Sequence, residues 1–174
     1  MICNDNDSTV HLYGIDSNLQ ALELRVIFPK GYLSAAKSVY TGRFLKDNFD
    51  SQQSEIMIHD KLSGIGHVYN LRDMKTHMKD PKPDLEFNFC QGQSKKLYAV
   101  NLDGRGGSDL MCLELGSRKY EVLHSLSLNT SSSSVKGNLG DFCESSQDTL
   151  TAGGDFNGDG LSDLACRHLS PTGG

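Results

Sequence analysis

Residues 154–166 read GDFNGDGLSDLAC and place four oxygen-bearing side chains in close succession. These side chains fall at every second or fourth place, at Asp155, Asn157, Asp159 and Asp163. Alternate acidic residues in a tight loop direct their oxygens inward, and Gly160 permits the positive-φ turn that brings the last carboxylate back. Oxygen ligands in this number suit Ca²⁺ better than any softer metal. The stretch therefore predicts a calcium site, with a plain polar turn between two strands as the alternative.

The spacing of this loop argues against an EF-hand, although the first six positions look the same. An EF-hand requires a bidentate Glu at position twelve and a helix on each side. Position twelve is Cys166 here, and residues 167–171 are too short and too limited by proline to form a helix. The last acid, Asp163, stands at position nine, directly before the apolar residues 164–166. We therefore expect a loop that leads into a strand.

The same pattern occurs 54 residues earlier in the chain. Residues 101–112 align with residues 155–166 without a gap, and a weaker copy at residues 41–59 aligns only with an insertion. Repeats of this length, with three or four strands each, have the size of propeller blades. The sequence thus predicts one domain, 1–174, of three repeat units, 1–64 (degenerate), 65–118 and 119–174.

Short apolar or alternating runs separated by turn residues predict an all-β protein of antiparallel, blade-like repeats. Two stretches fit strands less well, and short helical turns are expected at 34–39 and 71–79. The predicted strands lie at 9–14, 22–28, 97–100, 109–115 and 120–128.

Composition narrows the classes of partner. The net charge is −5 without a basic tract, which argues against nucleic acid as the main partner. No apolar run approaches the ~20 residues that a membrane-spanning helix needs. Residues 1–5 show no signal-peptide pattern, so the protein is cytosolic or the sequence begins at a mature or engineered start.

The cysteines favour an oxidising compartment. Cys90 and Cys112 are 22 residues apart, Cys143 and Cys166 are 23 apart, and a Phe precedes the first cysteine of each pair. Two nearly equal spacings around turn-rich loops predict two disulfides and hence a secreted protein, with four buried free thiols as the alternative. Cys3 is then the odd cysteine, either free or bonded outside the chain.

The motif Gly-Asp-Phe-Asn-Gly-Asp-Gly-x-x-Asp-Leu at 154–164 resembles the FG-GAP/VCBS type of repeat of integrin-α-like calcium-binding β-propellers and related secreted proteins and lectins. The resemblance is nearly complete at 154–164, recognisable at 101–110 and weak at 42–58. It implies a β-propeller blade with Ca²⁺ in the loop between its first two strands. The implied ligands are the side chains of Asp155, Asn157, Asp159 and Asp163 and the backbone carbonyl of Leu161. The paired cysteines are not general in the family and suggest a secreted subgroup.

The second loop keeps three of the ligand positions, at Asn101, Asp103 and Asp109, and has Arg105 where the third has Asp159. A guanidinium cannot ligate a cation and repels one nearby. We expect Arg105 to reach back to Asp103 or Asp109 and replace the ion with a salt bridge, with a weaker metal site as the alternative.

The remaining residue patterns do not indicate a zinc site or a serine-hydrolase site. The six histidines, His124 among them, have no zinc-type spacing and are interpreted as surface or strand residues. No G-x-S-x-G nucleophile elbow is present.

We therefore expect a secreted, non-catalytic binding module for adhesion or carbohydrate recognition, with a structural Ca²⁺ and an extracellular glycan or protein as ligand. Three blades do not close a propeller, so a longer propeller or a homo-oligomer would complete the ring. The alternatives are an oligomeric matrix or storage protein, or a secreted enzyme with a pocket between repeats that uses acids such as Asp84, Glu86 or Glu114.

Overall fold

The computed structural model describes residues 2–4, 10–15, 22–28, 36–45, 55–70, 82–124, 134–143, 148–152 and 154–167. These residues contain strands and connecting turns, and no helix. None of them belongs to a helix long and apolar enough to cross a membrane. The strands are β1 (Ile2–Asn4), β2 (Val10–Ile15), β3 (Leu22–Phe28), β4 (Lys37–Gly42), β5 (Glu55–Asp60), β6 (Ile65–Tyr69), β7 (Leu85–Asn88), β8 (Lys95–Val100), β9 (Asp109–Glu114), β10 (Lys119–Leu123), β11 (Val135–Asn138), β12 (Thr149–Ala152) and β13 (Leu164–Arg167).

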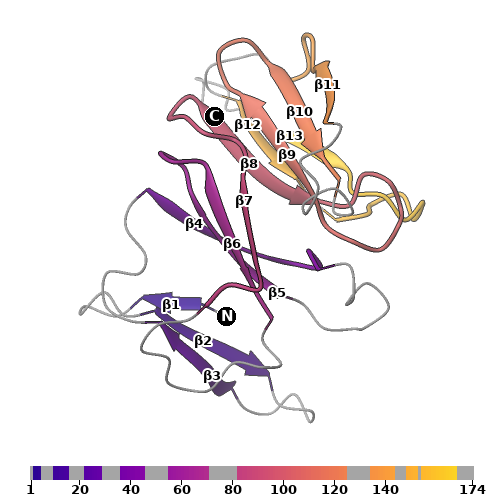
Figure 1. Ribbon diagram of the computed structural model, residues 1–174. Helices are drawn as coiled ribbons and strands as arrows, with labels where there is room; N and C mark the ends of the chain where they lie inside the picture. The colour runs from indigo at the N-terminus through magenta and orange to yellow at the C-terminus, as the bar shows by residue number, and fades with distance from the viewer. Residues whose placement is uncertain are drawn as a thin grey trace, which may run out of the picture.

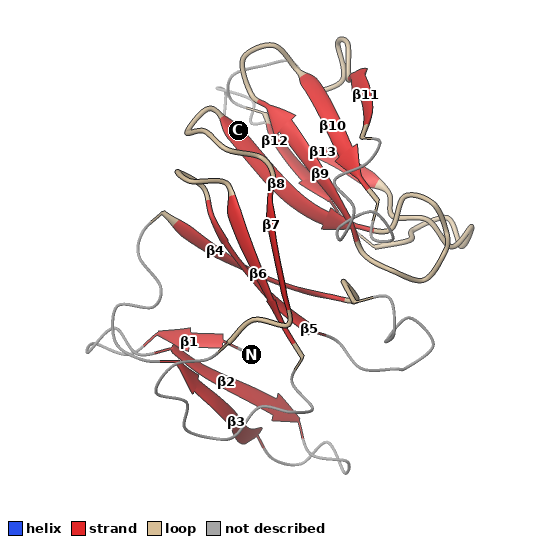
Figure 2. Cartoon of the chain, in the orientation of Figure 1, coloured by secondary structure: helices blue, strands red, loops and turns tan. Residues whose placement is uncertain are grey.

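The described strands form four antiparallel sheets in which neighbours in sequence are neighbours in space (Figures 1 and 2). The sheets are β1–β2–β3, β4–β5–β6–β7, β8–β9–β10–β11 and β12–β13. The predicted all-β, antiparallel class is confirmed. The four-stranded sheets run from Lys37 to Asn88 and from Lys95 to Asn138, so each crosses a boundary between predicted units, at 64/65 and at 118/119.

The expected helical turn at 34–39 is wrong in its described part. Lys37, Ser38 and Val39 belong to β4, whose residues pair in register with β5 from Lys37↔Asp60 to Gly42↔Glu55. The β-branched and aromatic residues Val39 and Tyr40 favour a strand, and the ladder with β5 fixes it. The second expected turn, 71–79, lies outside the described residues.

The second strand of each four-stranded sheet is covered on both faces. The first five residues of β5 and of β9 are all buried, in contrast to β4, in which every residue is exposed or half-buried. A strand buried on both faces lies between two other layers, and its sequence is a continuous apolar run and not an alternation. EIMIH and DLMCL are such runs, each opened by a single acid.

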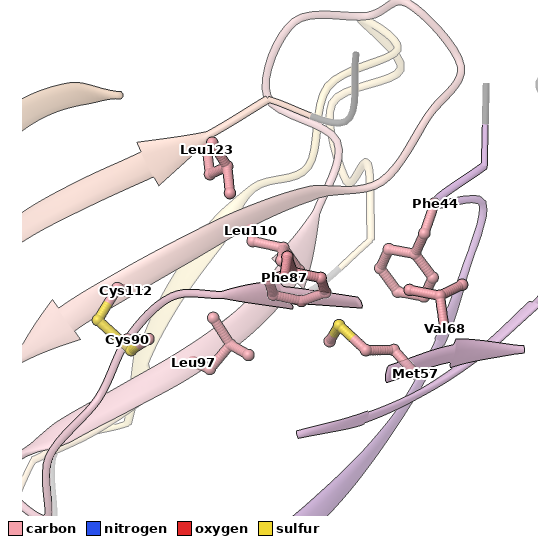
Figure 3. Close-up of a cluster of buried hydrophobic side chains, with 9 residues drawn as sticks. All are labelled: Phe44, Met57, Val68, Phe87, Cys90, Leu97, Leu110, Cys112 and Leu123. Carbon is pink, nitrogen blue, oxygen red and sulfur yellow. A yellow bond between two sulfur atoms is a disulfide. The ribbon is translucent and has the colours of Figure 1, made fainter. Parts of the chain in front are cut away.

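The hydrophobic cores lie between successive sheets. Figure 3 shows the first, in which Phe44, Met57 and Val68 from one sheet face Leu97 and Leu110 from the next. A second cluster joins Tyr98, Met111 and Val122 to Leu150 and the partly buried Leu164 of the β12–β13 sheet. The three sheets from β4 to β13 therefore bury their apolar faces against one another.

Two equivalent tyrosines tie these layers together. Tyr40 pairs with Met57 and Tyr98 with Met111, so they hold the same place in consecutive sheets. The Tyr40 hydroxyl donates to the carbonyl of Leu97 at 3.1 Å, and the Tyr98 hydroxyl donates to that of Leu150 at 3.1 Å. Burial raises the pKa of both phenols, that of Tyr98 to about 12, so both hydroxyls keep the proton that they donate.

Both predicted disulfides are present, and each joins two sheets. Cys90 follows β7 and bonds Cys112 in β9, with 5.3 Å between the Cα atoms. Cys143 follows β11 and bonds Cys166 in β13, with 5.4 Å between the Cα atoms. Each bond therefore fastens the end of one sheet to the second strand of the next.

Candidate metal centre

The two candidate loops occupy the same position in consecutive sheets. Residues 101–108 connect β8 to β9, and the loop that ends at Asp163 connects β12 to β13. Both therefore join the first strand of a sheet to its second strand, as the sequence repeat predicts.

Asp155 organises the loop at 155–163. Its Oδ1 accepts hydrogen bonds from the backbone N–H groups of Gly158 at 2.6 Å and Asp159 at 3.0 Å, and its Oδ2 accepts one from Gly160 at 2.8 Å. These backbone donors, Gly160 foremost, hold the pKa of Asp155 below its usual value because they stabilise the carboxylate. Gly158 and Gly160 have φ of +81° and +85°, which only glycine adopts at little cost.

The other predicted ligands complete the turn. Asn157 Oδ1 accepts from the N–H of Asp159 at 2.9 Å, and Asp159 Oδ1 accepts from that of Leu161 at 2.8 Å. Asp163 Oδ2 reaches back across the loop to the N–H of Phe156 at 2.7 Å. The loop is thus closed at both ends by side-chain oxygens.

The loop at 101–109 repeats three bonds of this framework. Asn101 Oδ1 accepts from Gly104 at 3.1 Å, as Asp155 does from Gly158. Asp103 Oδ1 accepts from Arg105 at 3.0 Å, as Asn157 does from Asp159. Asp109 Oδ2 accepts from Leu102 at 2.8 Å, as Asp163 does from Phe156. Gly104 and Gly106 have positive φ, like the two glycines of the sister loop.

A trace of the same framework survives in the preceding sheet. Glu55 opens β5 as Asp109 opens β9, and its Oε2 accepts from the N–H of Phe44 at 2.6 Å. This bond matches those made by Asp109 and Asp163 and supports residues 41–59 as a degenerate copy of the motif.

A serine connects each loop to the one before it. Ser162 donates its N–H to the carbonyl of Asn101 at 2.6 Å, and its Oγ accepts from the N–H of Asn101 at 2.9 Å. Ser108 makes the same reciprocal pair with Arg43, at 2.7 and 3.0 Å. The Asn101 side chain also donates to the carbonyl of Gly160 at 3.0 Å, so the two candidate loops are hydrogen-bonded to each other.

Arg105 turns toward Asp103, as expected, with 3.8 Å between Nε and Oδ2. The pair is long and the Arg105 side chain is 68% exposed, so this ion pair contributes little to stability. Sequence reasoning missed a closer neighbour, His124. Its Nδ1 lies 3.4 Å from Asp109 Oδ1 and 3.7 Å from Asp103 Oδ2.

The strand register could have revealed His124. Leu123 pairs with Leu110 in the antiparallel β10–β9 ladder. Continuing this register by one residue places His124, which follows Leu123, opposite Asp109, which precedes Leu110. Finding the pair from sequence requires the register, because the two residues are 15 positions apart.

The oxygen set at 155–163 suits a hard cation. It offers the side-chain oxygens of Asp155, Asn157, Asp159 and Asp163 and the carbonyl of Leu161, and Ca²⁺ takes 6–8 such oxygens. Each carboxylate has about four lone-pair sites, so accepting backbone N–H groups leaves sites for an ion. In the described part of the chain, ligand atoms of three His, Cys, Asp or Glu side chains come within 4.8 Å of one another at Asp103–Asp109–His124 and at Cys143–Asp148–Cys166, and Asp155, Asp159 and Asp163 do not form such a group. The second group holds a disulfide and therefore no thiolate ligand.

The acids of the enzymatic alternative serve other partners. Asp84 accepts from the N–H of Asn70 at 2.7 Å, and Glu86 lies 2.9 Å from the ring of His67. Glu114 accepts from the Ser117 hydroxyl and lines a surface hollow of about 170 Å³ beside Lys95, Lys119 and Lys136. Asp84 and Glu86 do not line this hollow.

Comparison with known proteins returns no family model, no curated protein and no solved structure that matches this chain.

Proposed function

We propose that this chain is a calcium-binding β-repeat module of the FG-GAP/VCBS type, in which Ca²⁺ at Asp155, Asn157, Asp159, Leu161 and Asp163 is structural. Its stacked four-stranded antiparallel sheets would be the blades of a propeller-like array. The ion would hold the loop between the first two strands of a blade in one conformation, so that neighbouring loops present a fixed surface.

The observation that carries this proposal is the shared hydrogen-bond framework of the two loops. Three equivalent bonds recur at the same positions, so the two loops share a backbone scaffold that carries different side chains. The fifth position is Arg105 in one loop and Asp159 in the other. The guanidinium of Arg105 repels a cation, whereas the carboxylate of Asp159 can bind one. This difference at one position of a shared loop is expected if the loop at 155–163 binds an ion.

The two inter-sheet disulfides support an extracellular site of action. Disulfides persist in oxidising compartments and are rare in the cytosol. All four cysteines belong to the inter-sheet cores, as buried or partly buried members, so the bonds are part of the structure and not surface redox devices.

The activity that we infer is non-catalytic recognition of an extracellular glycan or protein, in adhesion or carbohydrate binding. The test is a glycan array and an extracellular-protein array, each probed with the disulfide-intact chain in Ca²⁺ and in EDTA. We expect binding that is lost in EDTA and in Asp159→Ala. Binding of equal strength under all three conditions would separate recognition from the ion and contradict the proposal.

A gain-of-function variant tests the shared scaffold independently. Arg105→Asp places an acid at the fifth position of the second loop, where Asp159 stands in the third. We expect a second equivalent of Ca²⁺ to bind to Arg105→Asp in a calorimetric titration, with Lys119→Asp, an exposed charge reversal outside both loops, as the control. One equivalent in both variants would mean that the shared framework is not a calcium scaffold.

A further inference from the structure

The geometry points to a second metal centre of a different class, a zinc-type site formed by Asp103, Asp109 and His124. Its ligand atoms are Asp103 Oδ2, Asp109 Oδ1 and His124 Nδ1, which all lie within 4.8 Å of one another. The site does not depend on calcium at 155–163, because it shares no ligand with that loop.

Burial makes this group unlike a surface ion pair. The side chain of Asp109 is 0% exposed, that of Asp103 is 16% exposed, and His124 Nδ1 is itself buried and makes no hydrogen bond. Two carboxylate oxygens that face a buried ring nitrogen repel its lone pair. A positive charge between them removes the repulsion, and a proton or a metal cation can supply it.

The distances fit a metal ion. Zn²⁺ binds His nitrogen and carboxylate oxygen at about 2.0–2.2 Å in a tetrahedron, which separates neighbouring ligand atoms by about 3.3–3.6 Å. His124 Nδ1 lies 3.4 Å from Asp109 Oδ1 and 3.7 Å from Asp103 Oδ2. Both distances from His124 Nδ1 therefore lie within a few tenths of an ångström of the tetrahedral separation.

Each carboxylate is held by its other oxygen. Asp103 Oδ1 accepts from the N–H of Arg105, and Asp109 Oδ2 accepts from that of Leu102, so Asp103 Oδ2 and Asp109 Oδ1 remain turned toward His124. Hydrogen bonds of this kind orient the ligands of metal sites. The backbone framework that the two loops share therefore presents Asp103 Oδ2 and Asp109 Oδ1 to the imidazole of His124.

The donor set selects the class of cation. Ca²⁺ takes oxygen ligands, whereas an imidazole beside carboxylates suits Zn²⁺ and its first-row neighbours. Three protein ligands leave a fourth coordination position for water, as in many zinc sites. Arg105 Nε lies 3.8 Å from Asp103 Oδ2, so its positive charge weakens the affinity of this site for a cation.

The test is a calorimetric titration of ZnCl₂ into the untagged, disulfide-intact chain after removal of metal with EDTA and dialysis. We expect one saturable equivalent, at least about tenfold weaker in His124→Gln, and unchanged by an excess of Ca²⁺. His67→Gln is the matched control, because His67 is an exposed histidine paired with the single carboxylate of Glu86. Asp159→Ala should bind Zn²⁺ normally, and Arg105→Ala should bind it more tightly.

Two results would overturn the proposal. No saturable Zn²⁺ binding would mean that the charge between the ligands is a proton only. Equal affinity in His124→Gln and wild type would place the metal on other residues. If His124→Gln does not fold, NMR of the wild-type His124 ring decides, because its resonances must move as one equivalent of Zn²⁺ is added.

Discussion

At the scale of single residues, an acid recurs at or directly before the first residue of the second strand in three successive sheets. Glu55, Asp109 and Asp163 each accept the N–H of a residue at the start of the preceding loop. Glu55 and Asp109 are buried, and a buried carboxylate is tolerated only where hydrogen bonds replace water. These hydrogen bonds therefore join the two ends of each loop.

Glu55→Gln tests this role where no metal is proposed. The neutral amide accepts more weakly from the N–H of Phe44, so we expect a loss of about 1–3 kcal/mol in the free energy of unfolding, measured by urea denaturation. The control is Glu86→Gln, an exposed acid that should change stability by less than about 0.5 kcal/mol. Equal effects of both substitutions would contradict the structural role of Glu55.

His59 predicts a pH dependence of stability. It is buried, its Nε2 lies 2.8 Å from the carbonyl of Phe89, and burial lowers its pKa. Because the folded pKa is below the unfolded value of about 6.5, stability is fully present above pH 6.5 and decreases as the pH falls toward the folded pKa. Urea denaturation at pH 7.5 and 5.5 should show this loss in wild type and a smaller one in His59→Gln. An identical loss in the variant would assign it to other groups.

At the scale of elements, the junctions between sheets use the same contacts twice. A serine before β9 and the corresponding serine before β13 bond the preceding loop, and a tyrosine of the first strand bonds the next sheet. Because these bonds recur between different sheets, the relative placement of neighbouring sheets is specified by the repeat itself.

Ser108→Ala removes the hydroxyl that accepts from the N–H of Arg43 while it keeps the backbone bond in the other direction. The expected cost is about 1 kcal/mol in the free energy of unfolding, measured by thermal or urea denaturation. Ser94→Ala, at an exposed serine in the turn before β8, is the control and should be neutral. Equal free energies of unfolding for Ser108→Ala and Ser94→Ala would show that the serine junction does not stabilise the fold.

At the scale of the whole molecule, the disulfides fasten successive sheets along the chain. Cys90–Cys112 closes a loop of 22 residues, which in the chain-entropy account stabilises the folded state by about 3 kcal/mol. A Cys90→Ala/Cys112→Ala double variant should therefore unfold roughly 6–12 °C lower in calorimetry. An unchanged Tm would show that the packing of the first inter-sheet core alone joins these sheets.

Local features of the fold could be predicted from the sequence, and non-local ones could not. The apolar runs in β8 and β9 and the repeated glycines mark strands and loops directly, and the cysteine spacing predicted both pairs. Lys37–Val39 was misassigned because its strand identity comes from pairing with β5. His124 was missed because its relation to Asp109 depends on the register of β10 against β9.

The most direct test of the account is a calorimetric Ca²⁺ titration of the wild-type chain beside Asp159→Ala. Asp159 is exposed and bonds only to groups of its own loop in the described structure, so the variant should fold normally. We expect one equivalent of Ca²⁺ and a raised Tm in wild type, and at least tenfold weaker binding in the variant. Wild type without binding and without a thermal shift, or a variant that binds equally well, would contradict a calcium site at Asp155–Asp163.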